Sequence, residues 1–253
     1  MAAMSLTQSL RLSHRGWRYR LGSNRGEVQF VRSRIGPGDA VIDLGAHKGA
    51  FVYWMRSRVG SSGRVIAFEP QPPLASALRS IIAHRRWANV ELNELAVSDT
   101  PGKLMFGVPG SDPTSPGARL VPSEESDHRD YNATFEVDVV TLDEFLADRP
   151  KPIRFIKCDV EGVELSVFKG AKSLLEKDHP DLMFECEARH LDDGRVEDVL
   201  AFLQSLGYTG RFFQHGKLRP VEEFSVEEHQ AMGPDGTVNH PDYCNNFAFT
   251  HER

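Results

Sequence analysis

Cysteine is scarce in this chain, and no two cysteines have the spacing of a metal-binding or redox motif. The 253 residues include only Cys158, Cys186 and Cys244, an odd number without a C-x-x-C pair. Such usage fits a reducing compartment and argues against a zinc knuckle or a disulfide framework.

Long apolar runs are also missing. No stretch approaches the roughly 18 consecutive apolar residues of a membrane-spanning helix, and the N-terminus lacks the apolar core of a signal peptide. We therefore expect a cytoplasmic protein without a membrane span. The formal net charge of −6 argues against a dedicated nucleic-acid binder, because phosphate contacts need a basic face.

One segment departs from this acidic balance. Residues 1–35 hold seven arginines against a single glutamate. This segment is either an amphipathic cap that packs on the domain or a surface for an anionic partner. The remaining composition, 40% hydrophobic and 26% charged, is that of a globular domain with a sizeable core.

Short apolar strands alternate with amphipathic helical patterns, which indicates an open, mostly parallel α/β sheet with helices on both faces. We expect an N-terminal helical segment over 1–36 and one Rossmann-like domain over 37–253. The expected strands are 40–44, 64–69, 90–97, 153–158, 182–187, 208–214 and 246–250, and the expected helices are 49–59, one starting near Pro72, 162–175 and 192–206.

Residues from about 100 to 140 interrupt this alternation. Four prolines fall between positions 101 and 116, among glycines and serines. The apolar stretches 102–108 and 135–140 are expected to pair as an inserted hairpin. The polar stretch between them, about 107–133, is long enough to predict a mobile loop or lid.

The first strand runs into a glycine-rich turn, Asp43-Leu44-Gly45-Ala46-His47-Lys48-Gly49. Small residues between a strand and a helix let a ligand approach the backbone and its free N–H groups. The spacing is D-x-G-x-x-x-G, unlike the G-x-G-x-x-G of dinucleotide sites, and Asp43 would repel a diphosphate. Asp43 would instead suit the cationic amino-acid end of S-adenosylmethionine, and Glu69, at the end of the next strand, would accept the ribose hydroxyls.

Four motifs resemble the FkbM family of methyltransferases over roughly residues 26–190. They are VIDLGAHKGAF, AFEP, LNELAVSD and IKCDVEGVELSVFKGA, with a weaker echo in NNFAF at 245–249. The resemblance implies a seven-stranded Rossmann-like class I fold that binds S-adenosylmethionine and methylates oxygen on sugars, polyketides and similar natural products. It also implies cofactor contacts from Asp43, Gly45, Ala46, Gly49 and Glu69, and contacts along the adenine edge from Asn93, Ala96 and Ser98.

Carboxylates gather where the fourth and fifth predicted strands end. Asp159 and Glu161 follow one strand, Glu185 and Glu187 lie two apart in the next, and His190 comes shortly after. An alkyl hydroxyl, with a pKa of roughly 15 to 16, needs help to lose its proton during methyl transfer.

Two interpretations of this acidic end remain open. In the first, Asp159, Glu161 and Glu185 hold a divalent cation such as Mg²⁺ that binds the acceptor oxygen. In the second, no metal binds and His190 or Asp159 takes the proton directly. The expected catalytic residues are thus Asp159, Glu185 and His190, and His215 is a weaker candidate.

The combined prediction is an S-adenosylmethionine-dependent O-methyltransferase of a small-molecule acceptor, with a homo-oligomer left open. A nicotinamide-dependent oxidoreductase is the alternative enzyme, which the glycine spacing disfavours. A non-catalytic Rossmann module that binds a partner is the alternative outside catalysis.

Overall fold

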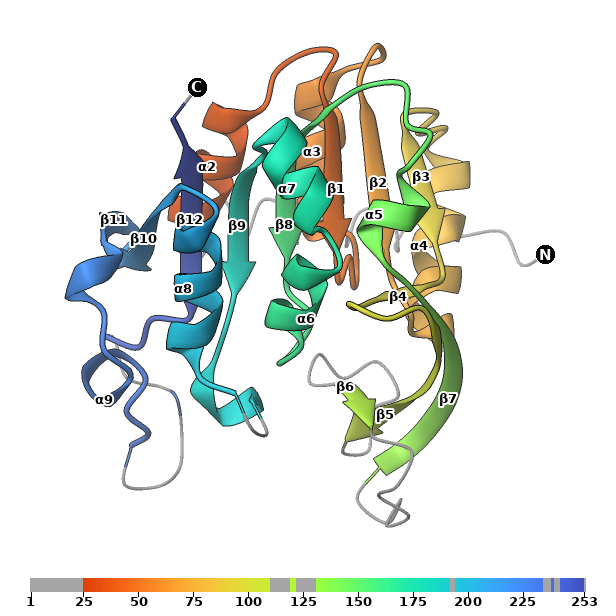
Figure 1. Ribbon diagram of the computed structural model, residues 1–253. Helices are drawn as coiled ribbons and strands as arrows, with labels where there is room; N and C mark the ends of the chain where they lie inside the picture. The colour runs from red at the N-terminus through yellow and green to blue at the C-terminus, as the bar shows by residue number, and fades with distance from the viewer. Residues whose placement is uncertain are drawn as a thin grey trace.

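The computed structural model describes residues 25–109, 119–121, 131–191, 194–233, 238 and 242–252. Its main element is a single sheet with helices on both faces (Figure 1). The strands of this sheet are β1 (Ala40–Leu44), β2 (Arg64–Phe68), β3 (Val90–Asn93), β8 (Ile153–Cys158), β9 (Asp181–Glu185), β10 (Tyr208–Gln214), β11 (Lys217–Pro220) and β12 (Asn246–His251).

The eight strands lie in the order β11-β10-β12-β9-β8-β1-β2-β3. The five from β9 to β3 are parallel, whereas β12, β10 and β11 are paired antiparallel at the other end. The expected α/β class is confirmed, but the count of seven strands is wrong. The turn at 215–216 folds β11 back on β10 and adds an eighth strand at the edge.

Two layers of helices cover the sheet. The helices α2 (Arg25–Arg34), α3 (Ala50–Val59) and α4 (Pro72–His84) lie on one face, and α5 (Leu142–Phe145), α6 (Glu164–Lys169), α7 (Lys172–Asp178) and α8 (Val196–Ser205) lie on the other. Within the described residues no helix is long and apolar enough to cross a membrane. The short helices η2 (Ala188–His190), η3 (Val221–Glu223) and α9 (Val226–His229) belong to the connections.

Alternation along the central strands sends successive side chains into the two layers. In β1, Ile42 and Leu44 enter the core beneath α6 to α8, whereas Val41 enters the core beneath α2 and α3. Asp43 therefore points toward the α3 side of the sheet. In the register between β1 and β8, Asp43 lies opposite Lys157.

A second, smaller sheet lies beyond the carboxyl ends of the parallel strands (Figure 1). It contains β4 (Ala96–Val97), β5 (Gly102–Pro109), β6 (Arg119–Val121) and β7 (Tyr131–Val140), in the order β4-β7-β5-β6. The antiparallel pairing of β5 with β7 confirms the predicted hairpin. Most of the predicted loop lies outside the described residues, as do residues 1–24 of the N-terminal segment.

Two elements differ from their predicted extents. The expected strand 90–97 divides into β3 and β4, which belong to different sheets. The expected helix 162–175 divides into α6 and α7 at Gly170, where a Cβ atom would lie 2.1 Å from the carbonyl oxygen of Ser98. Close packing of this turn on the chain after β4 breaks the helical run that the apolar periodicity predicted.

Candidate functional site

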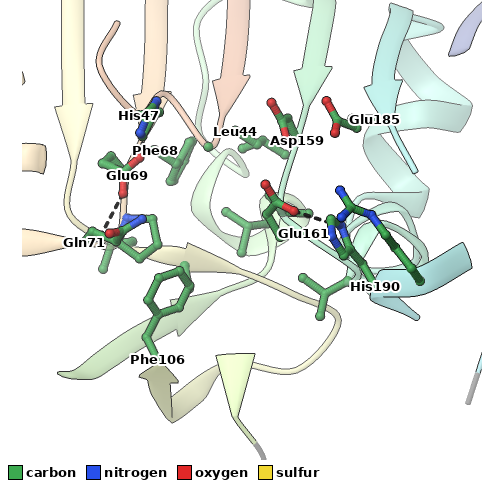
Figure 2. A pocket seen from close by; sticks show the side chains of 18 residues that line it. Leu44, His47, Phe68, Glu69, Gln71, Phe106, Asp159, Glu161, Glu185 and His190 are labelled. Carbon is green, nitrogen blue, oxygen red and sulfur yellow. Dashed lines mark hydrogen bonds and ion pairs between the residues drawn. The ribbon is translucent and has the colours of Figure 1, made fainter. Parts of the chain in front are cut away.

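A cavity of about 550 Å³ opens at the carboxyl ends of β1, β2, β8 and β9 (Figure 2). Ligands of open α/β sheets bind at this edge, and the volume lies within the range of small-molecule sites. Figure 2 shows Glu69 and Gln71 on one side of the cavity, Asp159, Glu161, Glu185 and His190 on the other, and Leu44 and Phe68 between them. The lining also includes the apolar residues Leu95, Ala96, Val97 and Phe106, and Gly45, His47 and Arg189.

The turn after β1 packs tightly on the end of β8. Gly45 has φ +71°, and a Cβ atom there would lie 1.9 Å from the carbonyl oxygen of Asp159. The backbone N–H groups of Gly45 and Ala46 both donate to the carbonyl of Phe68. This glycine is therefore required by the contact between two strand ends, in addition to its place on the cavity wall.

Glu69 is the most firmly held carboxylate at this end. Its side chain is buried, and it accepts hydrogen bonds from the backbone N–H of His47 at 2.6 Å and of Gln71 at 2.9 Å. Burial raises the pKa of Glu69 to about 7, although these two N–H groups act in the opposite direction. The result is a fixed acceptor on the cavity wall (Figure 2).

The middle of the cavity is apolar. Ala96 lines the cavity, and Phe106 reaches it from β5 of the second sheet. Asn93 and Ser98 do not reach it. The carbonyl of Asn93 accepts from the N–H of Glu69 and its amide contacts the carbonyl of Ala67, while Ser98 is buried. An aromatic base would find apolar side chains here.

Asp43 does not reach the cavity either. Its side chain is 1% exposed, and its Oδ1 lies 3.6 Å from the ammonium of Lys157. Burial raises the pKa of Asp43 to about 6, although Lys157 opposes the shift. Lys157 also lies 3.0 Å from Oδ2 of Asp159 and donates to the carbonyl of Gly45. Burial alone would lower the pKa of Lys157, but these carboxylates raise it above its ordinary value.

The loop after β8 presents Asp159 and Glu161 to the cavity. Glu161 has φ +58° and Gly162 has φ +106°, so the chain turns sharply between strand and helix. Oε2 of Glu161 lies 2.9 Å from Nδ1 of His190, and this hydrogen bond raises the pKa of the imidazole (Figure 2). Glu164, the first residue of α6, is buried and accepts from the N–H of Gly162.

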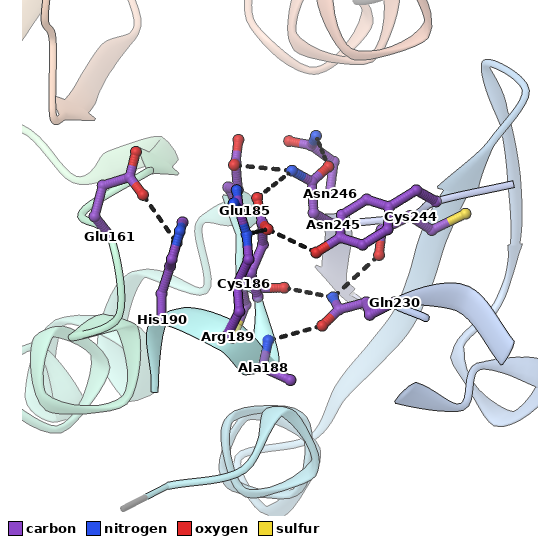
Figure 3. A network of polar contacts seen from close by, with 12 residues as sticks. Glu161, Glu185, Cys186, Ala188, Arg189, His190, Gln230, Cys244, Asn245 and Asn246 are labelled. Carbon is purple, nitrogen blue, oxygen red and sulfur yellow. Dashed lines mark hydrogen bonds and ion pairs between the residues drawn. The ribbon is translucent and has the colours of Figure 1, made fainter. Parts of the chain in front are cut away.

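Glu185 and Glu187 are linked by hydrogen bonds from Asn245, which lies close to the C-terminal strand β12. The strand β9 ends at Glu185, yet Nδ2 of Asn245 lies 2.8 Å from Oε1 of both glutamates (Figure 3). Burial and the neighbouring carboxylates raise the pKa of Glu185 well above its ordinary value. Burial would also raise the pKa of Glu187, but the donors Arg189, Tyr243 and Asn245 lower it to about 2.

Gln230 anchors this C-terminal segment beside the site. Its side-chain oxygen accepts from the N–H of Ala188, and its amide donates to the carbonyls of Cys186 and Cys244 (Figure 3). The chain before β12 is thereby attached to the turn after β9. This connection places Asn245 against the acidic end of the cavity.

The structure thus brings together only part of the predicted site. Seven of the expected residues line the cavity: Gly45, Glu69, Ala96, Asp159, Glu161, Glu185 and His190. Asp43, Ala46, Gly49, Asn93 and Ser98 are not among the residues that line it, and His215 faces Asp242 outside the cavity. Lys157 and Asn245 were not predicted. The i, i+2 spacing of Lys157 and Asp159 could have indicated the first. Asn245 begins the NNFAF echo at 245–249, but the resemblance gave this residue no role.

The expected metal site has no counterpart in the side-chain geometry. Among the residues that the structure describes, no group of three or more His, Cys, Asp or Glu side chains is arranged to hold a metal ion. Asp159 pairs with Lys157, Glu161 with His190, and Glu185 with Asn245. Each of these three acidic side chains therefore has a hydrogen-bond or ion-pair partner within the protein.

Comparisons with known proteins give a consistent picture. Residues 43–209 match the family model described as the methyltransferase FkbM domain. A crystal structure of an FkbM methyltransferase from Methylobacillus flagellatus KT superimposes with a TM-score of 0.54 at 15% identity, covering 98% of this chain and 56% of that one. A SAM-dependent methyltransferase from Aquifex aeolicus gives a TM-score of 0.47 at 15% identity, covering 96% of this chain and 98% of that one.

The chain therefore spans 56% of the length of the Methylobacillus protein. At 15% identity the structural likeness supports the Rossmann-like class I methyltransferase fold and nothing further. No curated protein sequence matches the chain significantly.

Proposed function

The chain belongs to the FkbM methyltransferase domain family, and from this premise we propose that it transfers the methyl group of S-adenosylmethionine to a hydroxyl oxygen of a small-molecule acceptor. The observation that carries the proposal is the arrangement of polar and apolar side chains along one cavity. A fixed carboxylate, Glu69, stands at one end, an apolar middle follows, and Asp159 and Glu185 stand at the other end.

The cofactor fits the first two parts of this cavity. Both oxygens of Glu69 are oriented by backbone N–H groups, which suits a carboxylate that accepts two ribose hydroxyls. Phe68, Leu95 and Phe106 offer the apolar surface that an adenine ring needs. S-adenosylmethionine would supply an electrophilic methyl group on a cationic sulfur.

Asp159 and Glu185 would act on the acceptor. Both line the cavity next to each other, at the end away from Glu69 (Figure 2). A carboxylate within hydrogen-bond reach of a hydroxyl orients it and takes its proton as the new bond to carbon forms. His190, whose Nδ1 is engaged by Glu161, would help to hold the acceptor at the rim.

The chemical class of the methyl-accepting molecule follows from the hydrogen-bonding groups at this end of the cavity. Carboxylates, an imidazole and the Arg189 guanidinium surround the space where the acceptor would lie, and such groups bind hydroxyl-rich molecules through several hydrogen bonds. We propose a sugar or a hydroxylated natural product as the acceptor.

Calorimetry with S-adenosylmethionine, S-adenosylhomocysteine and NAD⁺ tests the cofactor. We expect binding of the first two and none of NAD⁺; the opposite preference would contradict the proposal. Asp159→Asn and Glu185→Gln should then retain S-adenosylhomocysteine binding within a few-fold and lose methyl transfer from labelled S-adenosylmethionine to a panel of glycosides by at least about 100-fold. Glu176→Gln, on the exposed side of α7, is the matched control for a lost carboxylate.

A further inference from the structure

A buried lysine joins the two acidic strand ends of the site. The Nζ atom of Lys157 lies 3.0 Å from Oδ2 of Asp159, 3.6 Å from Oδ1 of Asp43 and 3.2 Å from the carbonyl oxygen of Gly45. The Nζ atom also lies over the ring of Phe51, on α3, at 5.4 Å from the ring centroid. The ammonium thus donates hydrogen bonds to Asp159 and Gly45 and forms a longer ion pair with Asp43, so its charge is shared between the two carboxylates.

The two carboxylates differ in what else they can touch. The side chain of Asp43 is 1% exposed and is absent from the cavity wall, whereas that of Asp159 is 30% exposed and lines the cavity. Asp43 therefore has no direct contact to offer a ligand in the cavity. With one cation between two anions, the group as a whole carries one net negative charge, and only Asp159 presents it to the cavity.

We propose that Asp43 is a positioning residue that acts through Lys157: it neutralises the lysine from the buried side, so that Asp159 keeps its negative charge for a cationic ligand. This inference rests on the proposed function, because S-adenosylmethionine is the cationic ligand concerned. It replaces the expectation that Asp43 touches the cofactor. It also gives Lys157 a role, as the cation that links Asp43 on β1 to Asp159 after β8.

The test compares two ligands that differ by one charge. S-adenosylmethionine carries a sulfonium cation that S-adenosylhomocysteine lacks, so the ratio of their affinities reports the charge of the site. Asp43→Asn should leave Lys157 and Asp159 as a neutral pair and lower this ratio about tenfold, the order expected for one buried charge at several ångström. Adding Lys157→Met restores one net negative charge and should restore the ratio of the native protein.

Calorimetry at pH 8 measures both affinities for each variant, and thermal unfolding monitors the fold. Asp159→Asn should lower the ratio as Asp43→Asn does, and an unchanged ratio in this variant would overturn the proposal even if Asp43→Asn does not fold. The matched control is Asp178→Asn, which removes another buried carboxylate, paired with Arg149 near the start of β8. It should lower the stability and leave the affinity ratio unchanged.

The outcomes separate this inference from the proposed function. A native protein that binds neither ligand would overturn both. A native protein that binds both, with the same affinity ratio in Asp43→Asn and in the double variant, would overturn only the role of Asp43. A ratio that falls in Asp43→Asn and falls further in the double variant would show a structural loss and would equally overturn it.

Discussion

The affinity for the cofactor should depend on pH through a single buried carboxylate. Glu69 accepts from the backbone N–H groups of His47 and Gln71, and burial raises its pKa to about 7 in the absence of ligand. The ribose hydroxyls would donate to this carboxylate, so binding requires its ionised form. Lowering the pH protonates Glu69 and removes the acceptor.

The magnitude follows from the ionised fraction. With a pKa of about 7, the carboxylate is about three-quarters ionised at pH 7.5 and about 3% ionised at pH 5.5. The affinity for S-adenosylhomocysteine should therefore fall by about 25-fold between these pH values. Because S-adenosylhomocysteine lacks the sulfonium charge, the measurement is less sensitive to other carboxylates.

Isothermal titration calorimetry at half-unit pH steps measures this dependence. The matched variant is Glu69→Gln, which keeps the shape and cannot titrate. Its affinity should be lower at pH 7.5 and nearly flat toward pH 5.5, apart from a smaller contribution of Asp43, whose pKa is about 6. A native affinity that does not change over this range, or a variant that falls as steeply as the native protein, would refute the assignment of Glu69 to the ribose.

The same ionisation has the opposite effect on the free protein. The pKa of Glu69 is raised above the ordinary value of 4.5, so its stabilising contribution is present below pH 4.5 and is lost as the pH rises through about 7. The loss is at most about 3 kcal/mol. Chemical unfolding should show the free protein weakening from pH 5 to pH 8, and S-adenosylhomocysteine should offset this loss.

Three further predictions follow from the same geometry. Gly45→Ala should lower the free energy of unfolding, measured in urea, by more than about 3 kcal/mol, because the new Cβ atom would lie 1.9 Å from the carbonyl oxygen of Asp159. The matched control is Gly60→Ala, which has nearly the same φ of +68° but open space around it and should cost only about 1 to 2 kcal/mol. Glu164→Gln should flatten the loss of stability between pH 5 and pH 8, because burial raises the pKa of Glu164 to about 7; an unchanged slope would contradict this. Methyl transfer should persist after EDTA treatment because Lys157 supplies a cation beside Asp159, and a loss that Mg²⁺ restores would refute this expectation.

The elements with a strong local pattern were predicted closely. The strand 40–44 is β1, and the helix starting near Pro72 is α4. A short apolar run and a proline in the first turn determine such elements from within a few residues. The division of 90–97 was missed because β3 and β4 pair in different sheets, and that of 162–175 because Gly170 packs against the chain after β4.

The sequence by itself determined which residue types stand at the strand ends: the glycine turn, Glu69, Asp159 and Glu185 follow short apolar runs, and parallel strands deliver their ends to one edge. Only the tertiary structure decided which of these side chains face the cavity. Strand register placed Asp43 against Lys157 rather than on the cavity wall. The antiparallel pairing of β12 with β9 brought Asn245 to Glu185, which lies about 60 positions earlier in the sequence. Register and long-range pairing depend on the packing of the whole sheet, so no local stretch of sequence contains them.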